Sequence, residues 1–465
     1  MEKTYDVVVV GAGLAGLTAA YELREQDVLV LEAADKLSSR SRHEEFAGYR
    51  ITVGGEDWAD PDPNSYVRSI ITELGVPTSN VHGSGAVIWK DELIWATSVE
   101  ELVAQLPLSA EAKPSFVATF ERIGQTVNAL YSEGGNDLAR ELLKVTATEW
   151  LGDIHPEVLH YYRRLYASEF TVAPEQVSAL YFVAYMVPYG GAGFDAWAEY
   201  RSPEGGMADV VEALAAKLPS APLTGAHVTR ITREGDDEVV TYLDSEGEHT
   251  VRARHVVVAT PAAVAAQVVT DLPAWKADAL GAVRSETALE MHVLVDDGGS
   301  MPWDDLLCAW TIDSVFGLLL PSQTDRSVRI VAAGTENKKS IIKLLSLGGP
   351  SAPFMDRTDE QIAAAFLHDF YRVFPEAQGR VTQYRIDRWS WGATYPRFGY
   401  EDAVLALTSP VRNVHFAGDW SGFARSDADG AFSPTDYSAM IGVHVAMGSG
   451  VRAAREIVDS QRQTN

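Results

Sequence analysis

Cysteine is almost absent from this chain: Cys308 is the only one among 465 residues. A single thiol can form no intrachain disulfide and cannot supply the ligands of a multi-cysteine zinc or iron–sulfur site, so we expect no such metal centre. Cys308 lies in the apolar run Leu306–Trp310, which predicts a buried structural thiol rather than a nucleophile. The scarcity of cysteine is typical of a reducing, cytoplasmic setting.

Long apolar runs and basic residues are also scarce. No segment approaches the roughly 20 apolar residues that cross a bilayer, and Val7–Val10 leads into glycines rather than a signal-peptide cleavage site. Only 38 Lys and Arg residues stand against 65 Asp and Glu residues, a formal net charge of -27. Because such a surface repels phosphate, we expect neither nucleic acid nor an anionic membrane as a partner. The polar stretch Asp459–Gln463 predicts no membrane anchor.

The first 31 residues read as strand, glycine turn, helix and strand. Tyr5–Val10 is rich in β-branched residues, Leu17–Arg24 suits a helix, and Val28–Leu31 suits a second strand. The turn Gly11–Gly16 has the spacing GxGxxG, and Glu32 directly follows the second strand. Glycines at this spacing let the backbone approach a pyrophosphate, while the acid accepts from ribose hydroxyls. This unit predicts a dinucleotide site.

The rest of the chain alternates between helical and strand-rich regions. Residues 61–200 are mainly helical, including an expected helix at Asn136–Thr148, and Ala226–Val258 reads as a meander. Strands such as Val328–Ala333 and one clear helix, Asp359–Val373, follow. We find no internal repeat, which indicates one interleaved protein rather than an array. We also expect a final strand at Val414–Ala417 and a last helix at about 442–459.

Four further segments distinguish FAD from NAD as the expected cofactor. They are Glu32–Arg40, Val53–Trp58, His415–Asp419 and Gly442–Ala454. In this order they resemble the flavin-containing amine oxidase family, which includes monoamine and L-amino-acid oxidases, and the resemblance covers nearly the whole chain. It implies an α/β fold in which a Rossmann-type FAD-binding domain (1–60, 201–272 and 396–465) is interleaved with a mixed α+β substrate-binding domain (61–200 and 273–395).

The resemblance also implies roles for residues at the cofactor. Arg40 would face the pyrophosphate, Val228 would hold the adenine through its backbone, and Asp419 would bind the ribityl chain or a phosphate. Val445 and Ala446 would begin a helix whose partial positive charge faces the flavin pyrimidine. Taken alone, Asp419 also fits a helix cap and Arg40 a surface ion pair. The other cofactor candidates are Gly11, Gly13, Ala15, Gly16, Glu32, Ala33, Gly54, Gly55 and Gly418.

An aromatic segment, Trp389–Tyr395, resembles the part of the family that presents rings to the flavin. We assign Trp391 and Tyr395 to the substrate pocket, with core packing of Trp389 and Trp391 as the alternative. Such rings exclude water and orient an uncharged amine by their faces.

Three polar candidates complete the predicted site. Glu56 could act as a base or anchor a cation, although a loop carboxylate bonded to backbone fits equally well. Tyr185, with Tyr189, could line an entrance beside a glycine loop. Arg326 could hold a carbonyl or carboxylate, with a solvated arginine as the alternative.

The chain departs from the family pattern in three places. Ala393 replaces the cysteine that binds flavin covalently in several members, so we expect noncovalent FAD. Ser38 and Ser39 replace the glycine pair before the arginine, which alters the phosphate contacts. The strand Leu289–Val295 contains no lysine, whereas many members place one near flavin N5.

Together these features predict an FAD-dependent amine or amide oxidase, in which hydride passes from the carbon next to nitrogen to flavin N5 and oxygen is reduced to hydrogen peroxide. One alternative is a biosynthetic oxidase of secondary metabolism in which the imine is captured within the substrate to close a ring. Another is a carbon–carbon desaturase or protoporphyrinogen-type oxidase. A flavin-binding scaffold without activity is the non-enzymatic alternative. The sequence does not decide the oligomeric state, and a homodimer is one of the alternatives.

Overall fold

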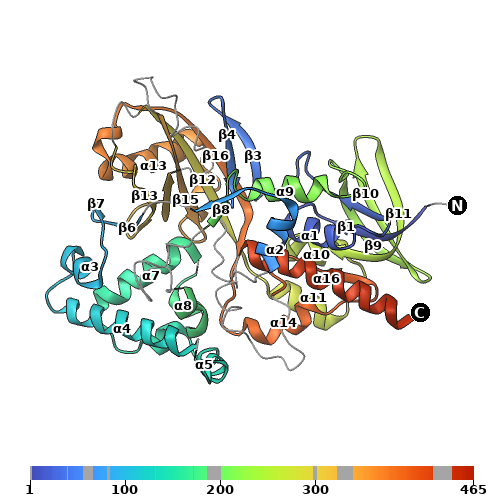
Figure 1. Ribbon diagram of the computed structural model, residues 1–465, viewed down its shortest axis with the longest axis horizontal. Coiled ribbons are helices and arrows are strands. Elements are labelled where there is room, and N and C mark those ends of the chain that lie inside the picture. Colours follow the sequence, from blue (N-terminus) through green and yellow to red (C-terminus); the bar gives the residue numbers. More distant parts are fainter. Residues whose placement is uncertain are drawn as a thin grey trace.

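The computed structural model describes residues 3–38, 40–55, 66–80, 84–130, 132–170, 172–185, 201–296, 301–321, 339–422 and 442–464. Its strands form two large sheets that lie at opposite ends of the molecule (Figure 1). Helices cover both sheets. None of the described helices combines the length and apolar character that a membrane span needs.

The first sheet is built from the beginning, middle and end of the chain. Its strands are β2 (Val28–Leu31), β1 (Thr4–Val10), β11 (Gly247–Val258), β10 (Asp237–Asp244), β9 (His227–Glu234) and β17 (Val414–Phe416). Strands β2, β1, β17 and the end of β11 are parallel, whereas the first part of β11 pairs antiparallel with β10. The expected meander at Ala226–Val258 therefore corresponds to β9, β10 and β11, and the end of β11 continues into the parallel part of the sheet.

Both faces of this sheet are covered, which explains the continuous valine run in β1. Val7 and Val9 pack with α1 (Leu14–Glu22), α2 (Tyr66–Leu74), α9 (Met207–Ala216) and α16 (Val443–Thr464). Val8 and Val10 pack with α10 (Ala262–Val268), α11 (Ala274–Ala282) and α14 (Tyr400–Thr408).

The first and last helices of the chain lie side by side. A Cβ on Gly450 would stand 2.3 Å from the Ala15 carbonyl oxygen, so only glycine lets α16 approach α1 this closely. This contact brings the start of α16 next to the glycine turn after β1.

The second sheet has the order β16, β12, β15, β14, β13, β6, β7. The bounds are β16 (Val381–Thr394), β12 (Ser285–Asp296), β15 (Lys339–Leu347), β14 (Leu318–Pro321), β13 (Leu306–Thr311), β6 (Ser84–Trp89) and β7 (Glu92–Ile94). Helix α13 (Asp359–Val373) packs on one face through Phe366 and Phe370. A helical layer packs on the other side of β13, where Cys308 is buried as expected.

This layer comprises α3 (Val99–Gln105), α4 (Ala112–Leu130), α5 (Gly135–Leu142), α6 (Ala147–Leu151), α7 (Pro156–Phe170) and α8 (Ala179–Tyr185). The prediction of a single helix at Asn136–Thr148 is wrong, because two helices, α5 and α6, cover this stretch. The chain leaves α5 at Leu142, and Thr146 then starts α6 with a reciprocal capping box to Glu149. The strand expected at Val328–Ala333 lies outside the described residues.

Two small antiparallel pairs complete the fold. The hairpin β3 (Ser41–Phe46) and β4 (Tyr49–Gly54) runs beside the second sheet, and β5 (Thr78–Asn80) pairs with β8 (Arg201–Pro203) (Figure 1). Hairpin residues Phe46, Ile51 and Val53 share a core with Leu294 and Ile341 of the second sheet.

Candidate active site

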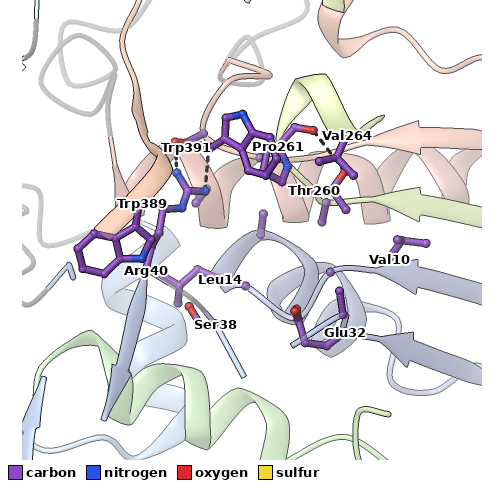
Figure 2. Close-up of a pocket in the computed structure, with 18 of the residues that line it drawn as sticks. Val10, Leu14, Glu32, Ser38, Arg40, Thr260, Pro261, Val264, Trp389 and Trp391 are labelled. Atoms are coloured by element: carbon purple, nitrogen blue, oxygen red, sulfur yellow. Dashed lines mark hydrogen bonds and ion pairs between the residues drawn. The ribbon is translucent and has the colours of Figure 1, made fainter. Parts of the chain in front are cut away.

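A cavity of about 860 Å³ opens at the carboxyl ends of the parallel strands of the first sheet. The segments that follow Val10, Leu31, Val258 and Phe416 all contribute to its wall. Open α/β sheets bind their ligands at this edge. The cavity runs from Glu32 at one end to Trp389 and Trp391 of the second sheet at the other (Figure 2).

The glycine turn forms one wall of the cavity. Gly11 has φ +104°, and a Cβ there would lie 2.8 Å from the Ala259 carbonyl oxygen. A Cβ on Gly13 would meet no protein atom within 4 Å and would instead project into open space. The Glu32 carboxylate is held at the turn by the N–H of Ala12 (2.7 Å) and of Ala34 (2.9 Å). This cradle of glycine backbone and fixed acid fits a dinucleotide.

Arg40 and Asp419 form an ion pair in the same wall. Nη1 of Arg40 lies 2.7 Å from Oδ2 of Asp419, and Nη1 also donates to the Gly392 carbonyl at 3.4 Å. Asp419 raises the pKa of Arg40 further above its ordinary value, so the guanidinium stays charged. About a third of the Arg40 side chain is exposed, at 36%. A charged, partly accessible guanidinium of this kind suits a phosphate ligand.

The loop that carries Asp419 is fixed by α16 and by the strand end of β11. The Gly418 N–H donates to Oγ of Ser449 at 2.8 Å, and Arg452 donates to the Phe416 carbonyl. On the other side, the Trp420 ring N–H donates to the Thr260 carbonyl at 2.9 Å. Asp419 is therefore placed by contacts to two separate elements.

The far end of the cavity is aromatic. Trp389, Trp391 and Tyr395 all line it, and they come from β16 and the residue that follows it. Trp391 is 45% exposed, whereas Tyr395 is buried and also belongs to the core of the helical layer. Trp389 packs against the hairpin core, as the core-packing alternative expected, and it lines the cavity as well. Ala393 lies in the same wall.

Most of the predicted residues meet in this one cavity. Those that line it are Gly11, Gly13, Ala15, Glu32, Ala33, Arg40, Gly55, Val228, Trp391, Tyr395, Gly418, Asp419 and Ala446.

Three predicted residues lie behind the wall instead. Gly16 packs against the Gly11 carbonyl, Gly54 packs on the Arg40 backbone, and Val445 is buried one position away from Ala446. In α16, Val443 and Ala446 line the cavity, because residues three positions apart lie on the same face of a helix. Glu56, Arg326 and Tyr189 lie outside the described residues, as does the side chain of Tyr185.

Sequence reasoning missed several lining residues. Thr260, Pro261 and Gln267 follow the end of β11, and His227 and Arg388 lie near the two ends of the cavity. Thr260 and Pro261 had a usable signal, because a valine run that leads into Thr-Pro indicates another parallel strand at the ligand-binding edge.

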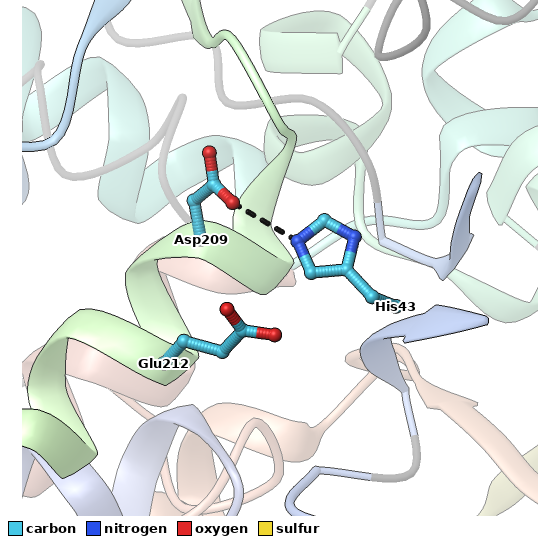
Figure 3. Close-up of side chains that lie close together, drawn as sticks. All are labelled: His43, Asp209 and Glu212. Carbon is cyan, nitrogen blue, oxygen red and sulfur yellow. Dashed lines mark hydrogen bonds and ion pairs between the residues drawn. The ribbon is translucent and has the colours of Figure 1, made fainter. Parts of the chain in front are cut away.

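Outside the cavity, one group of described residues has the composition of a metal site. His43 of β3 lies near Asp209 and Glu212 of α9 (Figure 3). Nε2 of His43 is 2.9 Å from Oδ1 of Asp209, but both carboxylate oxygens of Glu212 accept from Arg50 at 2.8 Å. We interpret the group as an ion-pair cluster that joins the hairpin to α9.

The fold and the cavity define a dinucleotide-binding α/β protein with a second, sheet-containing region that closes the cavity. Residues 14–433 match the family described as flavin containing amine oxidoreductase, and the chain belongs to this family of flavin-dependent oxidoreductases. The expected fold class and family are therefore confirmed.

Two curated relatives illustrate the match. A Mycobacterium tuberculosis protein named as a flavin-containing monoamine oxidase, AofH, is 32% identical over 283 residues, which span 58% of this chain and 60% of the relative. An L-amino-acid oxidase of Echis ocellatus is 24% identical over 91% of this chain and 86% of its own length.

Solved structures share the whole architecture. Wild-type putrescine oxidase bound to putrescine superposes with a TM-score of 0.72 at 19% identity, covering 98% of this chain and 99% of that one. Cyclohexylamine oxidase from Brevibacterium oxydans IH-35A gives a TM-score of 0.71 at 21% identity, covering 99% of this chain and all of the other. At these identities the likeness concerns the fold.

Proposed function

We propose that this chain binds FAD noncovalently and oxidises a carbon–nitrogen bond of a small amine or amide to an imine. The observation that carries the proposal is the continuity of the cavity, which joins the glycine turn and Glu32 to the aromatic segment at Trp391. FAD held by the glycine turn, Glu32 and Arg40 would supply the acceptor for a hydride from the carbon next to nitrogen, and oxygen would take up the electrons to give hydrogen peroxide.

Residues of the chain account for binding at the dinucleotide end. Glu32 accepts from ribose hydroxyls, since its carboxylate is already held in place by two backbone N–H groups. The open space at Gly13 admits a pyrophosphate, and the Arg40 guanidinium faces the same space with its charge. Helix α16 begins at Val443, two residues before the expected start at Val445, and this end lines the cavity and supplies N–H groups and partial positive charge.

At the other end, the chain orients the substrate and excludes water. Trp391 and Tyr395 line this end, and in the proposed complex their rings orient an uncharged amine and exclude water from beside it. Ala393 offers no nucleophile, and the single cysteine of the chain lies in the core at β13, which supports noncovalent binding.

The names of the relatives support amine chemistry. AofH is named as a monoamine oxidase, and the Echis ocellatus protein as an L-amino-acid oxidase. Both substrate classes place a nitrogen on the carbon that is oxidised. A protein from Exiguobacterium described as a protoporphyrinogen oxidase shares the fold at a TM-score of 0.66, so product analysis has to separate the two chemistries.

The test begins with purified protein that has been loaded with FAD. Acid precipitation should release all flavin into the supernatant if it is held noncovalently. Anaerobic addition of primary amines, L-amino acids and simple amides should bleach the oxidised flavin for one class, and air should then yield peroxide. Mass spectrometry distinguishes a hydrolysed imine, a ring-closed product and a desaturated product. No bleaching with any nitrogen compound, together with bleaching by a carbon–carbon substrate, would contradict the proposal.

A further inference from the structure

A buried ion pair lies in the second sheet, behind the wall of the cavity. Glu290 of β12 and Lys343 of β15 are on neighbouring antiparallel strands, and their side chains are 0% and 2% exposed. Nζ of Lys343 is 3.5 Å from Oε2 of Glu290. Neither residue is among those that line the cavity. Burying two charges has a large desolvation cost, so the further contacts of this pair matter.

Both members of the pair hold the same glycine. The Gly54 N–H donates to the Glu290 carboxylate, at 3.1 Å to Oε2 and 3.3 Å to Oε1. Nζ of Lys343 donates to the Gly54 carbonyl at 3.1 Å. The Glu290 carboxylate thus accepts from the N–H of Gly54, and the Lys343 ammonium donates to its carbonyl. The two charged side chains therefore fix the peptide groups on both sides of Gly54.

From Gly54 the contacts continue to Arg40. Gly54 has φ +87°, and a Cβ there would lie 2.3 Å from the Arg40 carbonyl oxygen, so the turn packs directly on the Arg40 backbone. The Gly55 N–H donates to that same oxygen at 2.7 Å, as does Oγ of Ser41. Gly55 and Arg40 both line the cavity.

We propose that Glu290 and Lys343 are positioning residues: by holding Gly54 from both sides, they set the backbone of Gly55 and Arg40 against the bound dinucleotide. The peptide between Gly54 and Gly55 transmits the effect, because its carbonyl accepts from Lys343 and its N–H donates to Arg40. The inference rests on the proposed binding of FAD, but it does not depend on which substrate is oxidised.

The effect of each residue on FAD affinity, and the coupling between the two effects, can be measured with three variants. Lys343→Met removes the ammonium 3.5 Å from the buried Glu290 carboxylate, and Glu290→Gln removes the negative charge beside Lys343. We expect each to weaken FAD binding about tenfold, because the turn that carries Gly55 shifts against Arg40. The double variant Glu290→Gln/Lys343→Met should lose less than the product of the two single effects, since the residues act on one glycine.

A matched control separates positioning from stability. Lys276 is a second buried lysine, and its Nζ donates to the carbonyls of Ala406, Leu407 and Ser409 at 2.9, 2.7 and 2.8 Å. Lys276→Met should lower the Tm of the FAD-free protein while leaving its Kd for FAD unchanged. The conservative variants Lys343→Arg and Glu290→Asp keep the charges, and they extend the comparison if the neutral variants do not fold.

The experiment measures the Kd for FAD by flavin fluorescence quenching, the flavin absorption spectrum, and the Tm of FAD-free protein. The inference predicts a raised Kd and an altered spectrum in the Lys343 and Glu290 variants, beyond any change in Lys276→Met. A fall in Tm with unchanged Kd and spectrum in all folded variants would overturn it. Wild-type protein that binds FAD but oxidises no amine would contradict the proposed reaction alone.

Discussion

Arg40 and Asp419 come from opposite ends of the chain, yet they form a two-point ion pair in the cavity wall. Nη1 lies 2.7 Å from Oδ2 and Nη2 lies 3.2 Å from Oδ1. Arg40 lies between β2 and β3, whereas Asp419 follows β17. The pair therefore closes the cavity across segments that only the folded chain brings together.

We predict that Arg40→Met weakens FAD binding by about 10- to 100-fold, the loss that follows removal of a charge-assisted hydrogen-bonding group. Arg40→Lys should recover only part of this loss, because an ammonium cannot reproduce the two-point contact with Asp419. Titration of flavin fluorescence gives both Kd values. Equal Kd values for wild type and Arg40→Met would show that the guanidinium faces away from the bound cofactor.

Two glycines of the turn should respond differently to substitution. Gly13→Val adds a side chain whose Cβ meets no protein atom within 4 Å, so the Tm of the FAD-free protein should fall less than in Gly11→Ala, while FAD affinity falls by roughly 10- to 100-fold. Gly11→Ala instead forces a Cβ to 2.8 Å from the Ala259 carbonyl at φ +104°, and it should lower the Tm as well. Thermal melts with and without FAD check both outcomes. If FAD raised the Tm of Gly13→Val as much as that of wild type, the glycine turn would not be the pyrophosphate-binding site.

The parts of the fold that were predictable are those in which the determining contacts are local. The turn from Gly11 to Glu32 was found because its glycines and acid lie within one βαβ unit. Helix α13 begins and ends at the expected residues, Asp359 and Val373, because Thr358 caps it and an apolar stripe defines its length.

The parts that were missed depend on contacts between distant segments. Strand β16 has a polar sequence at Arg385 and Asp387, and in the fold the Asp387 carboxylate accepts from both Arg385 and Arg42 of the hairpin. Similarly, Lys343 reaches Gly54 only because β15 pairs with β12. No periodicity in a single sequence shows such a pairing, so the positioning pair became visible only in the structure.

The cluster at His43 gives a prediction for stability in acid. The hydrogen bond from His43 lowers the pKa of Asp209 below its ordinary value of 3.8. As the pH falls below 3.8, Asp209 binds a proton in the unfolded chain more readily than in the folded chain. The contact with His43 therefore stabilises the folded state fully above this pH, and the stabilisation is lost as the pH falls through the lower pKa of folded Asp209.

Asp209→Asn removes this titration. The unfolding free energy of wild type should exceed that of the variant at about pH 6, and the difference should shrink as the pH falls toward about 3, as measured by urea unfolding. Asp236→Asn, which removes an exposed carboxylate on the turn between β9 and β10, is the control for net charge. A difference that stays constant over this range would contradict the role of the His43 contact.

Trp391 offers the sharpest test of the aromatic end of the cavity. Its ring lines the cavity and is 45% exposed, so Trp391→Ala should change the Tm little. If the ring orients the amine, KM should rise about tenfold, the loss expected for one aromatic contact, and Trp391→Phe should recover part of it. Tyr384→Ala removes a similarly exposed ring, at 39%, from the same strand outside the cavity, and it should leave KM unchanged. A large fall in Tm with unaltered KM would instead assign Trp391 to core packing, because a ring that only supports the fold contributes to unfolding free energy and not to substrate binding.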